Sequence, residues 1–285
     1  MNRLSTAERA KVVAVLVEGN SLRATARITG VARMTIEKLL RDLGAACAAH
    51  HAATVRGLKS QRIQCDEIWS FIGAKQKNVP EAKRGEWGDM WTWTAIDADS
   101  KLMVSYMVGP RMPQMAFAFM HDVATRLAGQ VQLTTDGLYW YPHAVESAFG
   151  IGVDYAVVEK HYGRVAGGNA PAATRYSPAR FTGATRAIKR GNPDPRYIST
   201  SFVERQNLTM RMHMRRFTRL TNGFSKKVEM HAHSVALHFA YYNFCKIHQS
   251  LRITPAMEAG LSDHVWTIEE LVSLLESSSV AGLTA

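Results

Sequence analysis

The chain has 285 residues, of which 46% are hydrophobic, and its formal net charge is +11. This length allows one large globular domain or two of ordinary size, and the positive charge favours nucleic acid over a membrane surface as partner. The N-terminus lacks the apolar stretch of a signal peptide, no apolar run is long enough to span a membrane, and three separated cysteines argue against a zinc finger or a disulfide framework. We therefore expect a protein of the reducing cytoplasm.

The first 45 residues are predicted to form a helix-turn-helix DNA-binding domain. Apolar residues recur at helical spacing over 6–18, a short second helix spans 22–29, and Gly30 and Val31 make a turn before a third helix over 33–43. The same apolar residues would serve a three-helix bundle that only dimerises, so that alternative stays open. If the third helix enters the major groove, its exposed candidates are Arg33, Thr35, Lys38 and Arg41.

Residues 46–60 are predicted to be a linker, and residues 61–250 an α/β domain. Strand patterns cover 61–73, 89–97, 102–108, 131–137 and 153–158, and helix patterns cover 112–127 and 139–149. Three antiparallel strands followed by alternating helices and strands predict a mixed five-stranded sheet flanked by helices.

Carboxylates in this domain are candidates for a functional site. Asp66 and Glu67 are adjacent in the first strand and must point to opposite faces, because side chains alternate along a strand. Asp136 ends the fourth strand and would lie beside Asp66 if the two strands are neighbours. Asp66 is then either a buried, hydrogen-bonded carboxylate or, with Asp136, part of an oxygen-rich site suited to Mg²⁺ or Mn²⁺.

The strand and helix pattern breaks over residues 159–199, where basic residues greatly outnumber acidic ones. This segment is too long for an ordinary loop. We expect it to contact the DNA backbone, and a solvated loop is the alternative. The candidate contacts are Arg186, Lys189 and Arg190.

A helix is predicted from Ser201, with Glu204 near its start. Its buried stripe would consist of Val203, Met210, Met214 and Phe217. Glu204 is either a favourable partner of the helix dipole or a third acid beside Asp66 and Asp136. Residues 251–285 are predicted to be an acidic tail with a short helix. Further basic candidates for DNA contact are Arg205, Arg211, Arg215, Lys226 and Lys227.

Five stretches, taken together and in this order, resemble a known family. They are 65–73, 134–137, 203–208, 224–231 and 241–255. The first three resemble the acid-bearing motifs of DDE transposases with a ribonuclease H-like, retroviral-integrase-like core. The closest match is to the insertion-sequence-one type of bacterial transposase, which 224–231 fits as well. The stretch 241–255 resembles the C-terminal signature shared by many such enzymes and by retroviral-type integrases. Members of that type often carry a cysteine-rich zinc motif at the N-terminus, where this chain has the helix-turn-helix pattern.

The resemblance implies a function and a mechanism. Asp66, Asp136 and Glu204 would be the catalytic residues and the ligands of two Mg²⁺ or Mn²⁺ ions, and water and then a freed 3′-hydroxyl would be the nucleophiles. The partners would be double-stranded DNA, as transposon ends and target, and a second copy of the chain, at the nucleoid of a bacterial or archaeal cytoplasm. The alternatives are a DNA-binding regulator or domesticated transposase that does not cut, and a ribonuclease H-like nuclease.

Overall fold

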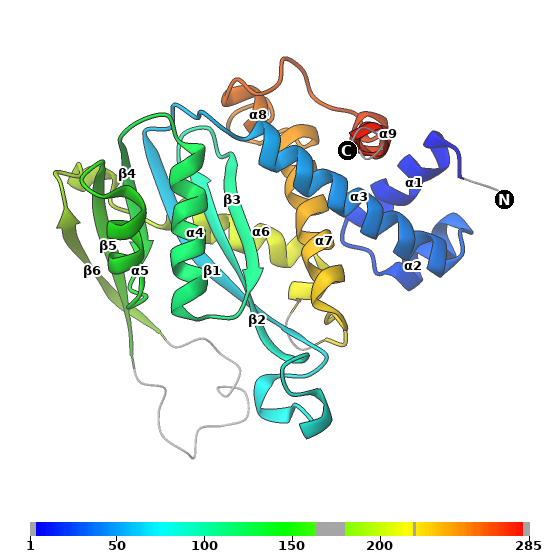
Figure 1. Cartoon of the computed structure of the whole chain (residues 1–285), viewed down its shortest axis with the longest axis horizontal. Coiled ribbons are helices and arrows are strands. Elements are labelled where there is room, and N and C mark those ends of the chain that lie inside the picture. Colours follow the sequence, from blue (N-terminus) through cyan, green and yellow to red (C-terminus); the bar gives the residue numbers. More distant parts are fainter. Residues whose placement is uncertain (1–3, 164–179, 219–220, 282–285) are drawn as a thin grey trace.

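A mixed six-stranded sheet forms the centre of the computed structural model, which describes residues 4–163, 180–218 and 221–281 (Figure 1). The strand order is β3-β2-β1-β4-β5-β6, with parallel pairing of β1 with β4 and of β4 with β5, and antiparallel pairing elsewhere. The strands are β1 Arg62–Ile72, β2 Gly88–Asp97, β3 Met103–Gly109, β4 Val131–Asp136, β5 Val153–Tyr162 and β6 Phe181–Arg190.

The prediction of five strands is wrong by one, because β6 lies inside the segment expected to be an irregular insertion. Its residues are mostly exposed on both faces, so the sequence carries no alternation of apolar and polar residues there. Pairing with β5, which runs to Tyr162, is what defines the strand. Residues 164–179 of the expected insertion lie outside the described part of the chain.

Helices cover both faces of the sheet (Figure 1). On one face, α4 (Pro113–Arg126) and α5 (Tyr141–Phe149) pack on a core that includes Trp93. On the other face, α6 (Ser201–His213) and α7 (Val228–Ala240) pack on a core around Ile68. The four side chains of the predicted stripe are all buried, but α6 ends at His213, so Met214 and Phe217 lie beyond the helix.

The N-terminal helices are α1 (Thr6–Val17), α2 (Leu22–Thr29) and α3 (Arg33–Thr54). Ser21 caps α2, and Gly30 ends it in the left-handed conformation, at φ 72°. The prediction of a linker over 46–60 is wrong for its first part, because α3 continues to Thr54. The alanine-rich run favours helix, and α3 shares a core with α1 and α7.

The C-terminal segment is more than the expected tail with one short helix. It forms α8 (Pro255–Glu258) and α9 (Ile268–Ala281). Leu271 and Val272 of α9 are buried in the core shared by α1, α3 and α7. None of the helices in the described ranges is long and apolar enough to cross a membrane.

His231 on α7 is buried between two serine hydroxyls, 2.7 Å from Ser225 Oγ and 3.3 Å from Ser70 Oγ. Burial lowers its pKa to about 3. The folded protein therefore excludes a proton that the unfolded chain binds below its ordinary pKa near 6.5, so stability is lost as the pH falls from about 6.5 toward 3.

We accordingly predict that His231→Gln loses less stability than the wild type when the pH is lowered from 7 to 5. The expected difference in the free energy of unfolding is about 2 kcal/mol, from the shift in proton uptake. Urea unfolding at both pH values measures it, with the exposed His143→Gln as control. An equal acid loss in the wild type and His231→Gln would show that His231 is not buried as a neutral group.

Candidate active site

Asp66, Asp136 and Glu204 line one cavity of about 660 Å³. Parallel β1 and β4 are neighbours, and their pairing ends at Cys65 opposite Thr135. Asp66 and Asp136 are the next residues on the two strands, so their side chains meet where the pairing stops. The structure thus brings together the acids that the sequence places in separate segments.

The start of α6 is fixed on β1 by a buried glutamine. The Oε1 atom of Gln64 accepts hydrogen bonds from the backbone N–H groups of Phe202, at 2.8 Å, and Val203, at 3.2 Å. These donors have no partner within the helix, so the glutamine stabilises the helix terminus and sets its position. Glu204 in the first turn is thereby directed to the cavity, where its carboxylate pairs with Lys160 and accepts a hydrogen bond from Thr200.

Asn207, one helical turn after Glu204, connects α6 to the first acid. Its Nδ2 donates to Oδ2 of Asp66 at 2.8 Å, and its Oδ1 accepts from the Thr94 hydroxyl at 3.4 Å. The backbone N–H of Glu67 donates to the other Asp66 oxygen at 2.8 Å. These donors hold the Asp66 carboxylate in one orientation.

Glu67 lies nearer to the site than the sequence indicates. It points to the α5 face and Asp66 to the α6 face, as alternation requires, since Tyr141 interacts with Glu67 and Asn207 with Asp66. Nevertheless, one oxygen each of Asp66, Glu67 and Asp136 lie within 4.8 Å of one another. Opposite faces therefore do not keep Glu67 away from Asp66 and Asp136. With no paired strand residue beyond Thr135 to separate them, side chains from both faces approach Asp136.

Asp66, Glu67 and Asp136 lie so close together that a negative charge on one makes ionisation of the others less favourable. Burial, followed by repulsion from Asp136, raises the pKa of Asp66 to about 7 and that of Glu67 to about 8. Burial also raises the pKa of Asp136, against the hydrogen bond from the Leu138 N–H at 3.1 Å. Bringing charged acids this close is unfavourable unless a cation is shared between them.

The donor atoms of this group fit a divalent cation. Oε1 of Glu67 is buried without a hydrogen-bond partner among the described residues, and the Glu67 side chain is only 1% exposed. The Tyr141 hydroxyl lies close enough to Glu67 to counteract part of the rise in its pKa, but the two do not form a hydrogen bond of good geometry. An all-oxygen set is what Mg²⁺ and Mn²⁺ prefer. The cluster does not include Glu204, which would have to leave Lys160 to join it.

Arg111 is a site residue that sequence reasoning missed. Its Nη2 lies 3.3 Å from Oε2 of Glu67, and its guanidinium lies over the Trp91 ring, 4.8 Å from the ring centroid. It also lines the cavity. Arg111 stands in the turn between β3 and α4, where no periodicity singles out a residue. Asn207 could have been found, because it lies three residues after Glu204 and so on the same side of the helix.

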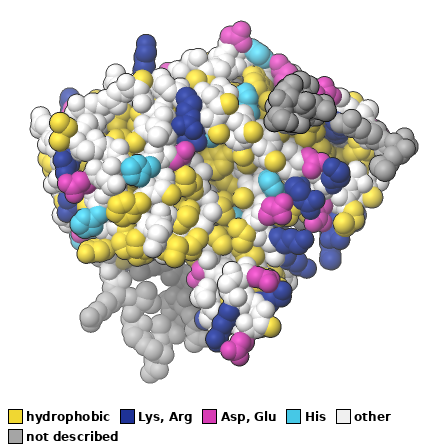
Figure 2. All heavy atoms as spheres, in the orientation of Figure 1, with side chains coloured by type: hydrophobic (Ala, Val, Ile, Leu, Met, Phe, Trp, Pro, Cys, Tyr) yellow, Lys and Arg dark blue, Asp and Glu magenta, His cyan; other side chains and the backbone are white. Residues whose placement is uncertain are grey.

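The predicted DNA-contacting residues fall on separate surfaces. On α3, Arg33, Thr35 and Lys38 are exposed, whereas Arg41 is half-buried with its Nε 3.7 Å from Glu229. Figure 2 shows Lys and Arg side chains gathered, among acidic ones, on the side of the molecule formed by the N-terminal helices. Five predicted DNA-contacting residues lie from α6 onward. Arg211 is half-buried, and the other four are exposed, namely Arg205, Arg215, Lys226 and Lys227.

The β6 candidates lie nearer to the acids. Arg186 is paired with Val158 on β5, and Val158 is paired with Asp136 on β4, so the three residues form one row across the sheet. Arg186 and Lys189 are exposed, whereas Arg190 pairs with Glu146 at 2.6 Å.

Comparisons with known proteins give a family match and matches among solved structures. Residues 189–245 match the family model described as IS1 transposase. No curated protein matches the chain. Among solved structures, the chain is similar to a piggyBac transposase in a synaptic complex with hairpin DNA, at 12% identity and a TM-score of 0.39, over 98% of this chain and 72% of that chain. The similarity to IS1 transposases falls on the segment that carries α6, with Glu204 in its first turn, and α7.

Proposed function

We propose that this chain is a DNA transposase with a ribonuclease H-like core, which cleaves and joins DNA strands with the help of divalent metal ions. The observation that carries the proposal is the meeting of Asp66, Asp136 and Glu204, from three distant segments, around one cavity. The match of residues 189–245 to IS1 transposases supports the class of reaction.

The proposed ligands of Mg²⁺ or Mn²⁺ are Asp66, Asp136 and Glu204, with Glu67 close enough to take part. When bound, two such ions would make water a better nucleophile and stabilise the charge on the attacking and leaving oxygens of the phosphodiester. Glu204 would exchange Lys160 for this role, and the freed ammonium would stand at the cavity wall.

Other residues in and beside the cavity orient the catalytic acids or supply positive charge. Asn207 orients the Asp66 carboxylate, and Gln64 fixes the helix that bears Glu204. Arg111 and Lys160 line the same cavity as the acids and supply positive charge for a scissile phosphate. No side chain needs to become bonded to DNA in this scheme, because water and then the 3′-hydroxyl attack the phosphorus.

The DNA partners belong to the same proposal. Residues 1–45 would read the terminal inverted repeats through α3, the β6 arginines would hold DNA beside the acids, and two copies would pair to bring two ends together. The protein would act at the nucleoid. The positive net charge of +11 supports a polyanionic partner.

Purified full-length protein incubated with labelled DNA that carries the inverted repeats flanking its gene tests the proposal. We expect nicking at the repeat ends and joining to target DNA with Mg²⁺ or Mn²⁺, and neither with EDTA. Specific binding without nicking under any metal condition would contradict it and favour a regulator that does not cut.

A further inference from the structure

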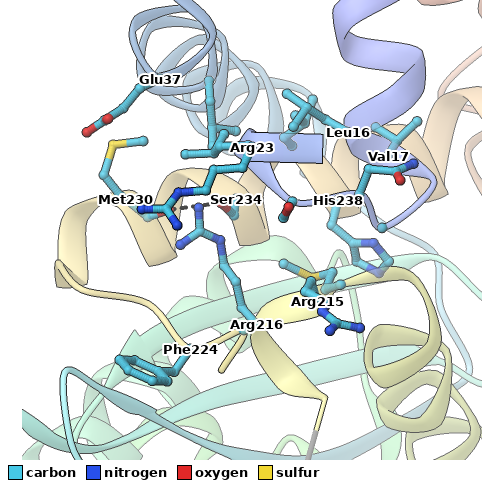
Figure 3. A pocket seen from close by; sticks show the side chains of 18 of the residues that line it. Leu16, Val17, Arg23, Glu37, Arg215, Arg216, Phe224, Met230, Ser234 and His238 are labelled. Atoms are coloured by element: carbon cyan, nitrogen blue, oxygen red, sulfur yellow. Dashed lines mark hydrogen bonds between the residues drawn. The ribbon is translucent and has the colours of Figure 1, made fainter. Parts of the chain in front are cut away.

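A second cavity, of about 540 Å³, lies between the N-terminal helices and the α7 side of the molecule (Figure 3). One wall comes from the turn between α1 and α2 and from the start of α3. The other comes from α7 and from residues 213–216 and 222–227, the first of which include the start of the short helix η4 (Arg215–Phe217). It shares no lining residue with the acidic cavity. We call it the interhelical cavity.

The interhelical cavity is strongly basic. Figure 3 shows Arg23 and Arg216 reaching into it from opposite walls. Glu37 is the acid among its described lining residues, against six permanently cationic ones. Like charges that line one cavity repel one another unless an anion lies between them. The cationic lining residues are Arg23, Arg33, Arg215, Arg216, Lys226 and Lys227.

Two polar groups in the lining, Arg216 and His238, have few partners. Arg216 donates to Ser225 Oγ at 2.9 Å, and burial lowers its pKa to about 10 against the attraction of the Glu37 carboxylate. His238, 5% exposed, lines the same cavity, and its Nε2 has no hydrogen-bond partner among the described residues. A guanidinium that is partly withdrawn from water and bonded to a neutral hydroxyl is the kind of group that an anion stabilises.

We propose that the interhelical cavity binds a backbone phosphate of the DNA that α3 contacts. Arg33 belongs both to the exposed first turn of α3 and to the cavity lining, so a duplex lying on α3 would bring its backbone to the cavity mouth. Half or more of protein–DNA hydrogen bonds go to phosphate and sugar. A phosphate held there would contact both walls and fix the N-terminal helices against the rest of the protein on DNA. The inference rests on the proposed function in taking DNA as the ligand.

The salt dependence of DNA binding tests the proposal with Arg23→Ala, in the cavity, and Arg27→Ala, on the same helix but outside the lining. For Arg23→Ala we expect about tenfold weaker binding, similar on all sequences, and a slope of log K against log[KCl] that is smaller by about one. For Arg27→Ala we expect the wild-type slope. Equal losses of affinity and slope in the two variants would show that the positive charge of α2 acts without a specific phosphate site, and would overturn the proposal.

A charge placed inside the cavity provides the second test. Ser234 lines the cavity from α7, and its hydroxyl donates to the Met230 carbonyl of its own helix, at 2.9 Å. Ser234→Glu would occupy the place of the phosphate, and Ser234→Gln is its neutral isostere. Relative to Ser234→Gln, we expect Ser234→Glu to have a higher Tm without DNA and an affinity for DNA about tenfold lower. A lower Tm, or an unchanged affinity, would contradict an anion site.

Both tests use binding and melting rather than strand cleavage. A protein that binds DNA through the interhelical cavity but never nicks it would remove the proposed chemistry and leave this inference standing. If the wild-type protein cleaves DNA and both Arg23→Ala and Ser234→Glu bind DNA normally, the proposed chemistry would stand and this inference would be wrong.

Discussion

Asp66→Asn, Asp136→Asn and Glu204→Gln are each expected to lower the rate of DNA strand cleavage by about a thousandfold or more. Each change removes one carboxylate charge that we propose binds metal, but keeps the shape of the side chain. The loss corresponds to about 4 kcal/mol of transition-state stabilisation, the scale of metal-ion catalysis. Cleavage of labelled repeat-end DNA under single-turnover conditions measures the rates.

The affinity for DNA should stay within about threefold of the wild type in all three variants, because phosphate contacts elsewhere supply most of the binding free energy. We also expect no loss in the stability of the folded state. Asp66→Asn removes charge from a cluster in which burial, followed by repulsion from Asp136, raises the pKa of Asp66 to about 7. Glu159→Gln changes another carboxylate of the same cavity lining and serves as the matched control. Near-normal cleavage in any of the three variants would remove that residue from the site.

Glu67→Gln is expected to raise the concentration of Mg²⁺ needed for half-maximal cleavage by about 10- to 100-fold, with much of the rate recovered at high Mn²⁺. Losses of this size are typical when a carboxylate that supports a metal site is changed. The reason here is that an oxygen of Glu67 lies within 4.8 Å of oxygens of Asp66 and Asp136, while Arg111 and Tyr141 also interact with Glu67. Metal titrations of the cleavage rate measure the effect, again beside Glu159→Gln.

Two results would contradict this account of Glu67. An unchanged metal requirement would place Glu67 outside the metal site, as an acid that serves only Arg111. A variant inactive at every metal concentration, together with an active Asp66→Asn, would mean that Glu67 rather than Asp66 is the essential acid of β1.

The alternation and periodicity of the sequence account for most of the sheet and its flanking helices. The neighbouring positions of Asp66 and Asp136 follow from β1 and β4 being parallel neighbours, a pairing that the strand patterns suggest but do not determine. The burial of Val203 and Met210 on α6 follows from spacing alone. These features depend on local pattern, which the sequence carries directly.

The remaining features depend on contacts between distant residues. β6 has no apolar alternation, and only β5 makes it a strand. The helix predicted over 33–43 does not end at Gly44. Gly44 lies within α3 and against His233 of α7, and burial against α7 supports the longer helix. Glu67 obeys alternation and still reaches Asp136, because the pairing of β1 with β4 stops one residue earlier. No pattern in one segment reveals where a neighbouring strand ends.

The most direct test of the central claim is anomalous diffraction from crystals of the protein with repeat-end DNA and Mn²⁺. We predict manganese peaks in contact with Asp66 and Asp136, and Glu204 turned from Lys160 toward the metal. Manganese bound only elsewhere, or Glu204 still paired with Lys160 around a correctly placed scissile phosphate, would contradict the assignment of these three acids as the catalytic site.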